Sequence, residues 1–309
     1  MVATGDGVLR CPVCGDVDRR LWGRTDSYEL HRCVSCCAVF THPMPSSDEL
    51  SRLYTTGRYF RGGGYAGYVA GYEASVRSQR LLHETILDHI GPPESHGKLL
   101  EVGCAEGHFL DAARKRGWEV CGVELSRSAA AAARSRFGVP VLDGHVEDQP
   151  LESSSWSVVV LLDVLEHLPD PARALRTVAR LLRPGGRLVI KTPDIGSAIA
   201  RRLGMRWEQI KPPEHLVYFD AQAIGRMLRA CGFDLDQRRE VGGTGIVAAI
   251  RRSMRRHPSI DCPSIVRALL VMRRARWLAW LLTRASTLLG RQDSMLVFAH
   301  RVMDGAGRA

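Results

Sequence analysis

The chain has 309 residues, and its 45% hydrophobic and 25% charged residues are typical of a globular protein and exclude general disorder. No uncharged apolar run approaches the roughly 20 residues of a transmembrane helix, and the N-terminus lacks the apolar stretch of a signal peptide, so we expect a cytoplasmic protein. Lys and Arg outnumber Asp and Glu by 43 to 33, for a net charge of +10. Most of this excess lies within 249–291, so an anionic partner would concern that segment.

Residues 1–42 carry two C-x-x-C pairs, which are Cys11 with Cys14 and Cys33 with Cys36. Each pair can present two thiolates from one tight turn, and together they supply the four sulfurs of a closed tetrahedral zinc site. Because so short a segment has almost no core, the metal would contribute much of its folding free energy. The spacing therefore predicts a zinc-ribbon-like segment with structural Zn²⁺. Unligated cysteines in a reducing cytosol are the alternative.

Residues 43–94 are expected to form a linker and a helical cap. The stretch 43–66 is loop-rich, with a Pro- and Ser-rich start and three consecutive glycines between aromatic residues. Helical periodicity begins near Tyr68 and continues to Ile90, where Gly-Pro-Pro ends it.

A strand–helix rhythm then fills a core of 95–248 and returns in a last strand within 292–309. We expect strands at 98–103, 118–125, 140–144, 156–165, 187–193, 233–241 and 295–302, and helices at 109–117, 126–138, 171–186 and 221–232. This alternation predicts a doubly wound, mostly parallel α/β sheet of seven strands.

The loop after the first core strand has the pattern of a nucleotide-type binding site. Gly103 permits a tight turn, and Gly107 lets the next helix start pack closely, so a ligand can approach the backbone N–H groups. Glu124, at the end of the following strand, can accept hydrogen bonds from both hydroxyls of a ribose. With Glu101 and these glycines, the segment 99–109 resembles the first motif of class I S-adenosylmethionine-dependent methyltransferases.

The resemblance continues in order along 95–240. Residues 143–148 match the segment that covers adenine, 162–171 match the motif after strand four, and 182–188 match the turn before strand five. It implies a Rossmann-like methyltransferase fold and S-adenosyl-L-methionine as cofactor. It also implies cofactor contacts at Glu101, Gly103, Cys104, Ala105, Gly107, Phe109, Glu124, Leu125, His145, Val146, Asp163 and His167.

The loop 211–219, after the fifth strand, carries candidate catalytic residues. A sulfonium already activates its methyl group, so the enzyme mainly has to align a nucleophile and remove its proton. Glu214, His215 and Tyr218 lie together there, and imidazole titrates near neutral pH, which suits a general base. The chain is also similar to zinc-knuckle sugar methyltransferases in its knuckles and its E-H-x-x-Y-F stretch, which points to the same three residues. A purely structural role for His215 stays open.

We therefore expect a methyltransferase acting on a small-molecule acceptor, such as a hydroxyl of a sugar, a glycolipid or a secondary metabolite. One alternative is an RNA methyltransferase that holds RNA with the zinc ribbon. The seven basic residues of 1–42, counting His, form no dense stripe, which disfavours nucleic acid. The other alternative is a non-catalytic cofactor-binding scaffold, which the intact Glu101, Gly103, Gly107 and Glu124 disfavour.

The basic segment 249–291 is an insertion before the last strand and predicts one or two helices that combine Trp with Arg. Such a helix can lie in a membrane interface with its arginines on anionic headgroups, which would bring the protein to the inner membrane face and suit a lipid-linked acceptor. A helical lid over the acceptor cleft and an oligomer contact are the two alternatives.

Overall fold

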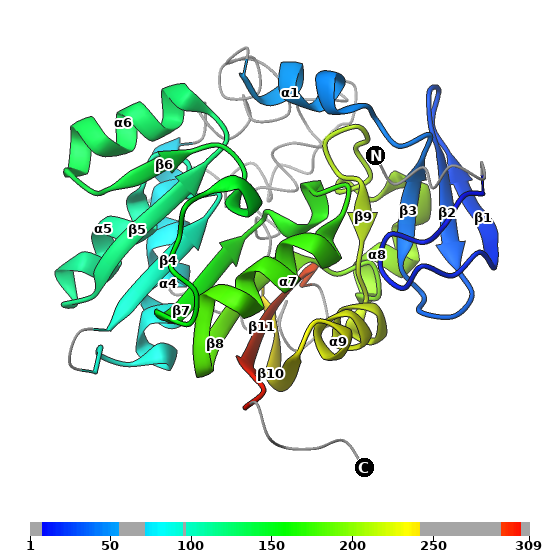
Figure 1. Cartoon of the computed structure of the whole chain (residues 1–309). Coiled ribbons are helices and arrows are strands. Elements are labelled where there is room, and N and C mark those ends of the chain that lie inside the picture. Colours follow the sequence, from blue (N-terminus) through cyan, green and yellow to red (C-terminus); the bar gives the residue numbers. More distant parts are fainter. Residues whose placement is uncertain (1–7, 56–71, 95–96, 242–291, 304–309) are drawn as a thin grey trace, which may run out of the picture.

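The computed structural model describes residues 8–55, 72–94, 97–241 and 292–303 (Figure 1). The expected helical insertion at 249–291 and the glycine-rich stretch at 62–64 lie outside the described residues. Within the described ranges the chain forms two β-sheets flanked by helices.

The larger sheet has seven strands in the order β10-β11-β8-β7-β4-β5-β6 (Figure 1). Strands β6, β5, β4, β7 and β8 pair in parallel, whereas β11 runs antiparallel to both β8 and β10. The doubly wound, mostly parallel sheet predicted from the sequence is thus confirmed. Its strands are β4 (Lys98–Val102), β5 (Glu119–Glu124), β6 (Val141–Asp143), β7 (Trp156–Leu162), β8 (Leu182–Pro193), β10 (Phe233–Val241) and β11 (Ser294–Arg301).

Helices cover both faces of this sheet. One face packs against α4 (Tyr72–Ile90), α5 (His108–Lys115) and α6 (Arg127–Phe137), and the other against α7 (Pro171–Leu181) and α9 (Ala221–Ala230). Side-chain caps fix where three of them begin. Ser126 accepts a bond from the backbone of α6, Asp170 does so for α7, and Asp220 for α9.

The smaller sheet joins the N-terminal segment to the core. Its order is β1 (Arg19–Arg24), β2 (Glu29–Cys33), β3 (Val39–His42) and β9 (Val217–Tyr218), with every pair antiparallel. Strand β9 belongs to the loop 211–219 and lies beside β3 in Figure 1. The sequence placed the ribbon within 1–42, yet its sheet takes its last strand from the core.

Hydrophobic contacts continue across this junction. Leu30 and Val39 of the small sheet share a buried cluster with Trp207 and Tyr218 of the core. Arg32 adds an ion pair of 3.2 Å to the capping residue of α9. The N-terminal segment and the core are therefore packed as one body.

A short helix, α1 (Ser47–Thr55), occupies part of the stretch expected to be loop. Ser46 and Glu49 form a capping box: the Glu49 carboxylate accepts from the backbone N–H of Ser46 at 2.8 Å, and the Ser46 hydroxyl accepts from that of Glu49 at 3.3 Å. The S-x-x-E spacing was the signal in the sequence. The remaining short helices of the described residues are α8 (Ala198–Leu203), η1 (Val146–Asp148), η2 (Leu165–His167) and η3 (Gly204–Arg206). Among the described residues, no helix is long and apolar enough to cross a membrane.

Candidate active site

The predicted cofactor residues gather where the strand order reverses. The chain proceeds from β4 through β5 to β6 in one direction, then restarts at β7 on the other side of β4. Ligands of open α/β sheets bind outside the carboxyl ends of the strands at such a point. The loops after β4, β5 and β7 all begin at this edge of the sheet.

Two glycines shape the loop after β4. Gly103 has φ of 72°, and a Cβ there would lie 2.4 Å from a methyl group of Val164. Gly107 has φ of 78°, and its Cβ would lie 2.9 Å from that of Ala133 in α6. Both positions therefore require glycine, as the sequence indicated. Between them, Ala105 takes a left-handed φ of 46°, which is uncommon for a residue with a side chain.

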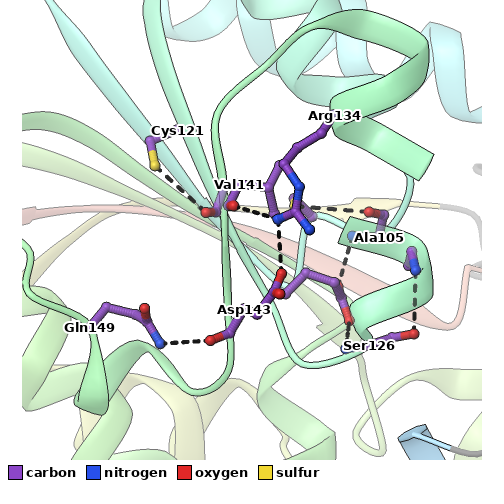
Figure 2. Close-up of polar contacts among 11 residues, drawn as sticks. Ala105, Cys121, Ser126, Arg134, Val141, Asp143 and Gln149 are labelled. Atoms are coloured by element: carbon purple, nitrogen blue, oxygen red, sulfur yellow. Dashed lines mark hydrogen bonds and ion pairs between the residues drawn. The ribbon is translucent and has the colours of Figure 1, made fainter. Parts of the chain in front are cut away.

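The carboxylate of Glu124 holds this loop from the neighbouring strand. It accepts a hydrogen bond of 2.8 Å from the backbone N–H of Ala105 and another of 2.8 Å from that of Ser126, both drawn in Figure 2. Each carboxylate oxygen has a second lone pair, so the group can still accept from ribose hydroxyls. Glu124 thus fits the predicted cofactor role and also positions the loop.

A second carboxylate, Glu101, lies buried close to Glu124. Burial, followed by the nearby charge of Glu124, holds the pKa of Glu101 well above its ordinary value, and burial also raises the pKa of Glu124. Within the described part of the chain, Oε2 of Glu101 meets no hydrogen-bond partner. Two adjoining buried carboxylates fit a ligand that carries positive charge, and S-adenosylmethionine has both a sulfonium and an ammonium group.

The segment predicted to cover adenine is tied down on both sides. Arg134 of α6 forms an ion pair of 2.9 Å with Asp143. Gln149 donates to the backbone carbonyls of Asp143 at 3.2 Å and of His145 at 3.0 Å, and Figure 2 shows the contacts of Arg134 and Gln149 with Asp143. These bonds leave His145 exposed and Val146 buried. An exposed imidazole beside a buried apolar residue suits the edge of a base-binding surface.

The other predicted cofactor residues differ in setting. Cys104 and Phe109 are buried in the hydrophobic cluster that packs α4, α5 and α6 against the sheet, and Leu125 is partly buried. Asp163 is exposed, adopts a left-handed φ of 54° and forms an ion pair with Lys191. Their contact with the cofactor stays a prediction.

The loop 211–219 is brought against the motif that follows β7. The backbone N–H of Leu216 donates to the carbonyl of Glu166 at 2.8 Å, and Nδ1 of His167 lies 2.7 Å from the carbonyl oxygen of Glu214. The centroids of the His167 and His215 rings are 4.7 Å apart. The fold thus brings together His167 and the loop 211–219, which the sequence predicted as two separate candidates.

Within this loop, the predicted catalytic residues are mostly buried. His215 is 3% exposed, and the hydroxyl of Tyr218, itself 1% exposed, donates to the His215 carbonyl at 3.1 Å. Glu214 is partly buried and lies 3.5 Å from the ammonium of Lys211. Burial lowers the pKa of His215 well below its ordinary value, so its imidazole is neutral at pH 7.

Sequence reasoning did not single out one residue of this region, Glu166. It is 1% exposed, and its Oε2 accepts from the hydroxyl of Thr192 at 3.0 Å. Burial, and next the charge of Asp163, raises the pKa of Glu166 to about 8. The residue stands inside the motif 162–171, so the signal was present, but only the fold shows that its side chain turns inward.

The four predicted zinc ligands form one cluster. The sulfurs of Cys11 and Cys36 are 3.5 Å apart, as are those of Cys14 and Cys33, and all four lie within 4.8 Å of one another. Sulfurs bound tetrahedrally to zinc at about 2.3 Å are about 3.8 Å apart, so the cluster fits this ion, whereas a disulfide needs about 2.05 Å. The cluster can therefore hold Zn²⁺ without rearrangement of the backbone.

Comparisons with known proteins agree with this geometry. A family model described as "Methyltransferase domain" matches residues 74–238. A protein of Mycobacterium tuberculosis named as a probable S-adenosylmethionine-dependent methyltransferase is 35% identical over 113 residues, 36% of this chain and 41% of that protein. A ubiquinone biosynthesis O-methyltransferase of Alkalilimnicola ehrlichii is 35% identical over 101 residues, 31% and 41% of the two chains.

Among solved structures, geranyl diphosphate C-methyltransferase from Streptomyces coelicolor superposes with a TM-score of 0.51 at 18% identity, covering 75% of this chain and 84% of that one. This likeness shows the fold alone. The curated matches span 41% of the length of those relatives.

The fold and the cofactor loop, which is the turn 103–107 after β4, together define a Rossmann-like α/β protein. The chain belongs to the methyltransferase-domain family.

Proposed function

We propose that this chain is an S-adenosylmethionine-dependent methyltransferase that transfers the methyl group to a hydroxyl of a small molecule, such as a sugar, a glycolipid or a secondary metabolite. The observation that carries this proposal is the contact between the loop 211–219 and the motif after β7, with the rings of His167 and His215 4.7 Å apart. Oxygen nucleophiles need a group that removes their proton, and a relative named as an O-methyltransferase supports the choice of oxygen.

The residues of the chain divide the work between two sides of the site. S-adenosylmethionine, when bound, supplies a methyl group that its sulfonium activates. Glu101 and Glu124 would hold the positive charge and the ribose, while the turns at Gly103 and Gly107 let the ligand reach the backbone. His215 would act on the acceptor hydroxyl, either by taking its proton directly or through a group that it binds.

Labelled methyl transfer tests this proposal. The protein is incubated with radiolabelled S-adenosylmethionine and separate lipid, small-molecule and RNA fractions of the source cells. We expect label in the lipid or small-molecule fraction, and label confined to RNA would contradict the proposal. His215→Ala should lower turnover by about 100-fold or more and leave the affinity for S-adenosylhomocysteine within about threefold. Full turnover in that variant would assign His215 a structural role.

We further propose that Cys11, Cys14, Cys33 and Cys36 bind one structural Zn²⁺. Support comes from the spacing of their four sulfurs, which lie within 4.8 Å of one another. Four protein ligands leave no open position, so the ion would stabilise the segment rather than take part in the reaction. Elemental analysis should find zinc in wild-type protein and lose it in Cys36→Ser.

For the segment 249–291, we propose peripheral contact with anionic lipid. Its arginines and tryptophans support this, and the segment lies outside the described residues. Co-sedimentation with anionic vesicles at low salt should be lost at high salt and in a variant with Arg273, Arg274 and Arg276 changed to Gln. Protein that stays in the supernatant at low salt would favour a lid.

A further inference from the structure

Glu166, His167 and His215 form a second cluster of possible metal ligands. One ligand atom from each residue lies within 4.8 Å of the others. Glu166 and His167 lie in η2, whereas His215 comes from the loop after β8. The backbone bond from Leu216 to Glu166, 2.8 Å long, holds the two segments together.

Two of the three residues each carry a candidate ligand atom that lacks a hydrogen-bond partner in the described part of the chain. Oε1 of Glu166 and Nδ1 of His215 are buried there and meet no hydrogen-bond partner. Their residues are only 1% and 3% exposed. A buried polar atom without a partner costs free energy, and nearly all such atoms in proteins are satisfied by some group. One cation between them would satisfy both.

The surrounding bonds orient the cluster as the outer shell of a metal site does. Nδ1 of His167 lies 2.7 Å from the carbonyl oxygen of Glu214, and because a carbonyl only accepts, Nδ1 carries the proton and Nε2 the lone pair. Metal-binding histidines are commonly held in this way. The hydroxyl of Thr192 fixes the other oxygen of Glu166 at 3.0 Å.

The electrostatics favour a cation rather than an internal ion pair. The two nearest lysines have other partners, since Lys191 pairs with Asp163 and Lys211 lies 3.5 Å from the Glu214 carboxylate. Ligands around a cation with bonds of about 2.1 Å lie about 3–4 Å apart, so small side-chain adjustments would close the set.

We propose that Glu166, His167 and His215 bind a divalent transition-metal cation that holds the acceptor hydroxyl. Two imidazoles and one carboxylate suit Zn²⁺, Fe²⁺ or Mn²⁺ and leave open positions for substrate oxygen. The cation lowers the pKa of the hydroxyl, whose proton passes to water. The oxygen then bonds to the methyl carbon as the carbon–sulfonium bond breaks, and neutral S-adenosylhomocysteine leaves. This reaction step rests on the function proposed above, whereas the cation site does not.

Metal titration of the full chain, with its cysteine cluster loaded with zinc, tests the site. Mn²⁺ binding is followed by electron paramagnetic resonance, and further Zn²⁺ binding by calorimetry. We expect one site beyond the cysteine cluster, weakened at least tenfold in Glu166→Gln and in His215→Asn. Glu84→Gln is the matched control, since Glu84 is a surface residue of α4 paired with Arg80, and it should bind as wild type does.

S-adenosylhomocysteine affinity distinguishes a variant that has lost only the metal site from one that no longer folds. Each variant should bind S-adenosylhomocysteine within about threefold of wild type. Absence of a second site for both Mn²⁺ and Zn²⁺, or unchanged affinity in both variants, would overturn the proposal. If no site exists but His215→Ala still abolishes methyl transfer, the cation is wrong and His215 acts as a base. If the site exists and small-molecule fractions accept no methyl group, the cation stands and the proposed function fails.

Discussion

Replacement of Glu124 by Ala tests whether the cofactor loop works as its geometry indicates. In the folded protein this carboxylate already accepts two backbone bonds of 2.8 Å, from Ala105 and from Ser126. The bound cofactor would add the ribose hydroxyls to the same group. The variant should therefore lose both the cofactor's anchor and the support of the loop that contacts it.

The magnitude follows from those contacts. Hydrogen bonds to a charged group contribute about 1.5–3 kcal/mol each, so two ribose bonds contribute at most about 3–6 kcal/mol. We expect a smaller loss of binding free energy, about 2–4 kcal/mol, because water replaces part of these bonds in the variant. At 1.4 kcal/mol per factor of ten, affinity for S-adenosylhomocysteine should fall by about 30- to 700-fold. The free energy of unfolding should also fall, by about 1–3 kcal/mol, because two N–H groups lose their acceptor.

Calorimetry with S-adenosylhomocysteine and denaturant unfolding measure the two effects separately. Glu119→Ala is the matched control, because Glu119 starts the same strand but is exposed. It should change neither quantity by more than the error of the assay. Glu124→Ala protein that binds within about threefold of wild type, with its fold intact, would remove Glu124 from the cofactor site.

Two further predictions concern backbone strain and acid stability. Gly103→Ala should lower the free energy of unfolding, measured with denaturant, by about 2–4 kcal/mol, because it puts a side chain on a left-handed φ and a Cβ 2.4 Å from Val164. Gly138→Ala is the control in the same assay. Gly138 has φ of 65° but open space around its Cβ, so only the cost of the left-handed φ, about 1–2 kcal/mol, is expected. Burial lowers the pKa of His83 to about 4 from 6.5, so stability that is complete above pH 6.5 should be lost as pH falls from 6.5 to 4, by at most about 3 kcal/mol. Unfolding curves from pH 7 to 4 should flatten in His83→Leu but not in the control His300→Gln, and a parallel loss in His83→Leu would refute the assignment.

Local patterns were sufficient to predict the large sheet. Its strands are apolar runs such as Trp156–Leu162, and each helix between them begins or ends with a cap or a glycine that the sequence displays. The glycines of the cofactor loop were predictable for the same reason. Gly103 and Gly107 are required by the left-handed φ of the turn and by the close approach of neighbouring side chains.

Long-range pairing was not predictable in this way. Strand β9 is two residues long, and its partner β3 lies about 180 positions earlier, so no periodicity could reveal it. The role of Glu166 was hidden for a related reason. Its burial against Thr192 and His215 depends on how two distant loops meet, and sequence spacing carries no information about that contact.

The pairing of β3 with β9 connects the segment that holds the cysteine cluster to the loop 211–219. The N–H of Thr41, in β3, donates to the carbonyl of Leu216 at 2.9 Å, and its hydroxyl donates to the carbonyl of His215 at 3.3 Å. The proposed Zn²⁺ ion would stabilise this segment, so its loss in Cys36→Ser should release β3 and with it the loop 211–219.

The cofactor loop lies on β4 and β5, in the other sheet, so it should survive this release. We therefore expect Cys36→Ser to bind S-adenosylhomocysteine within about fivefold of wild type while amide exchange in the loop 211–219 rises at least tenfold. The matched control is Cys37→Ser, which changes the next residue but no proposed zinc ligand. Unaltered exchange in the loop, together with complete loss of zinc, would show that the cluster stabilises only its own strands. A parallel loss of cofactor binding would show instead that the ion supports the whole fold, because the two sheets would then unfold as one unit.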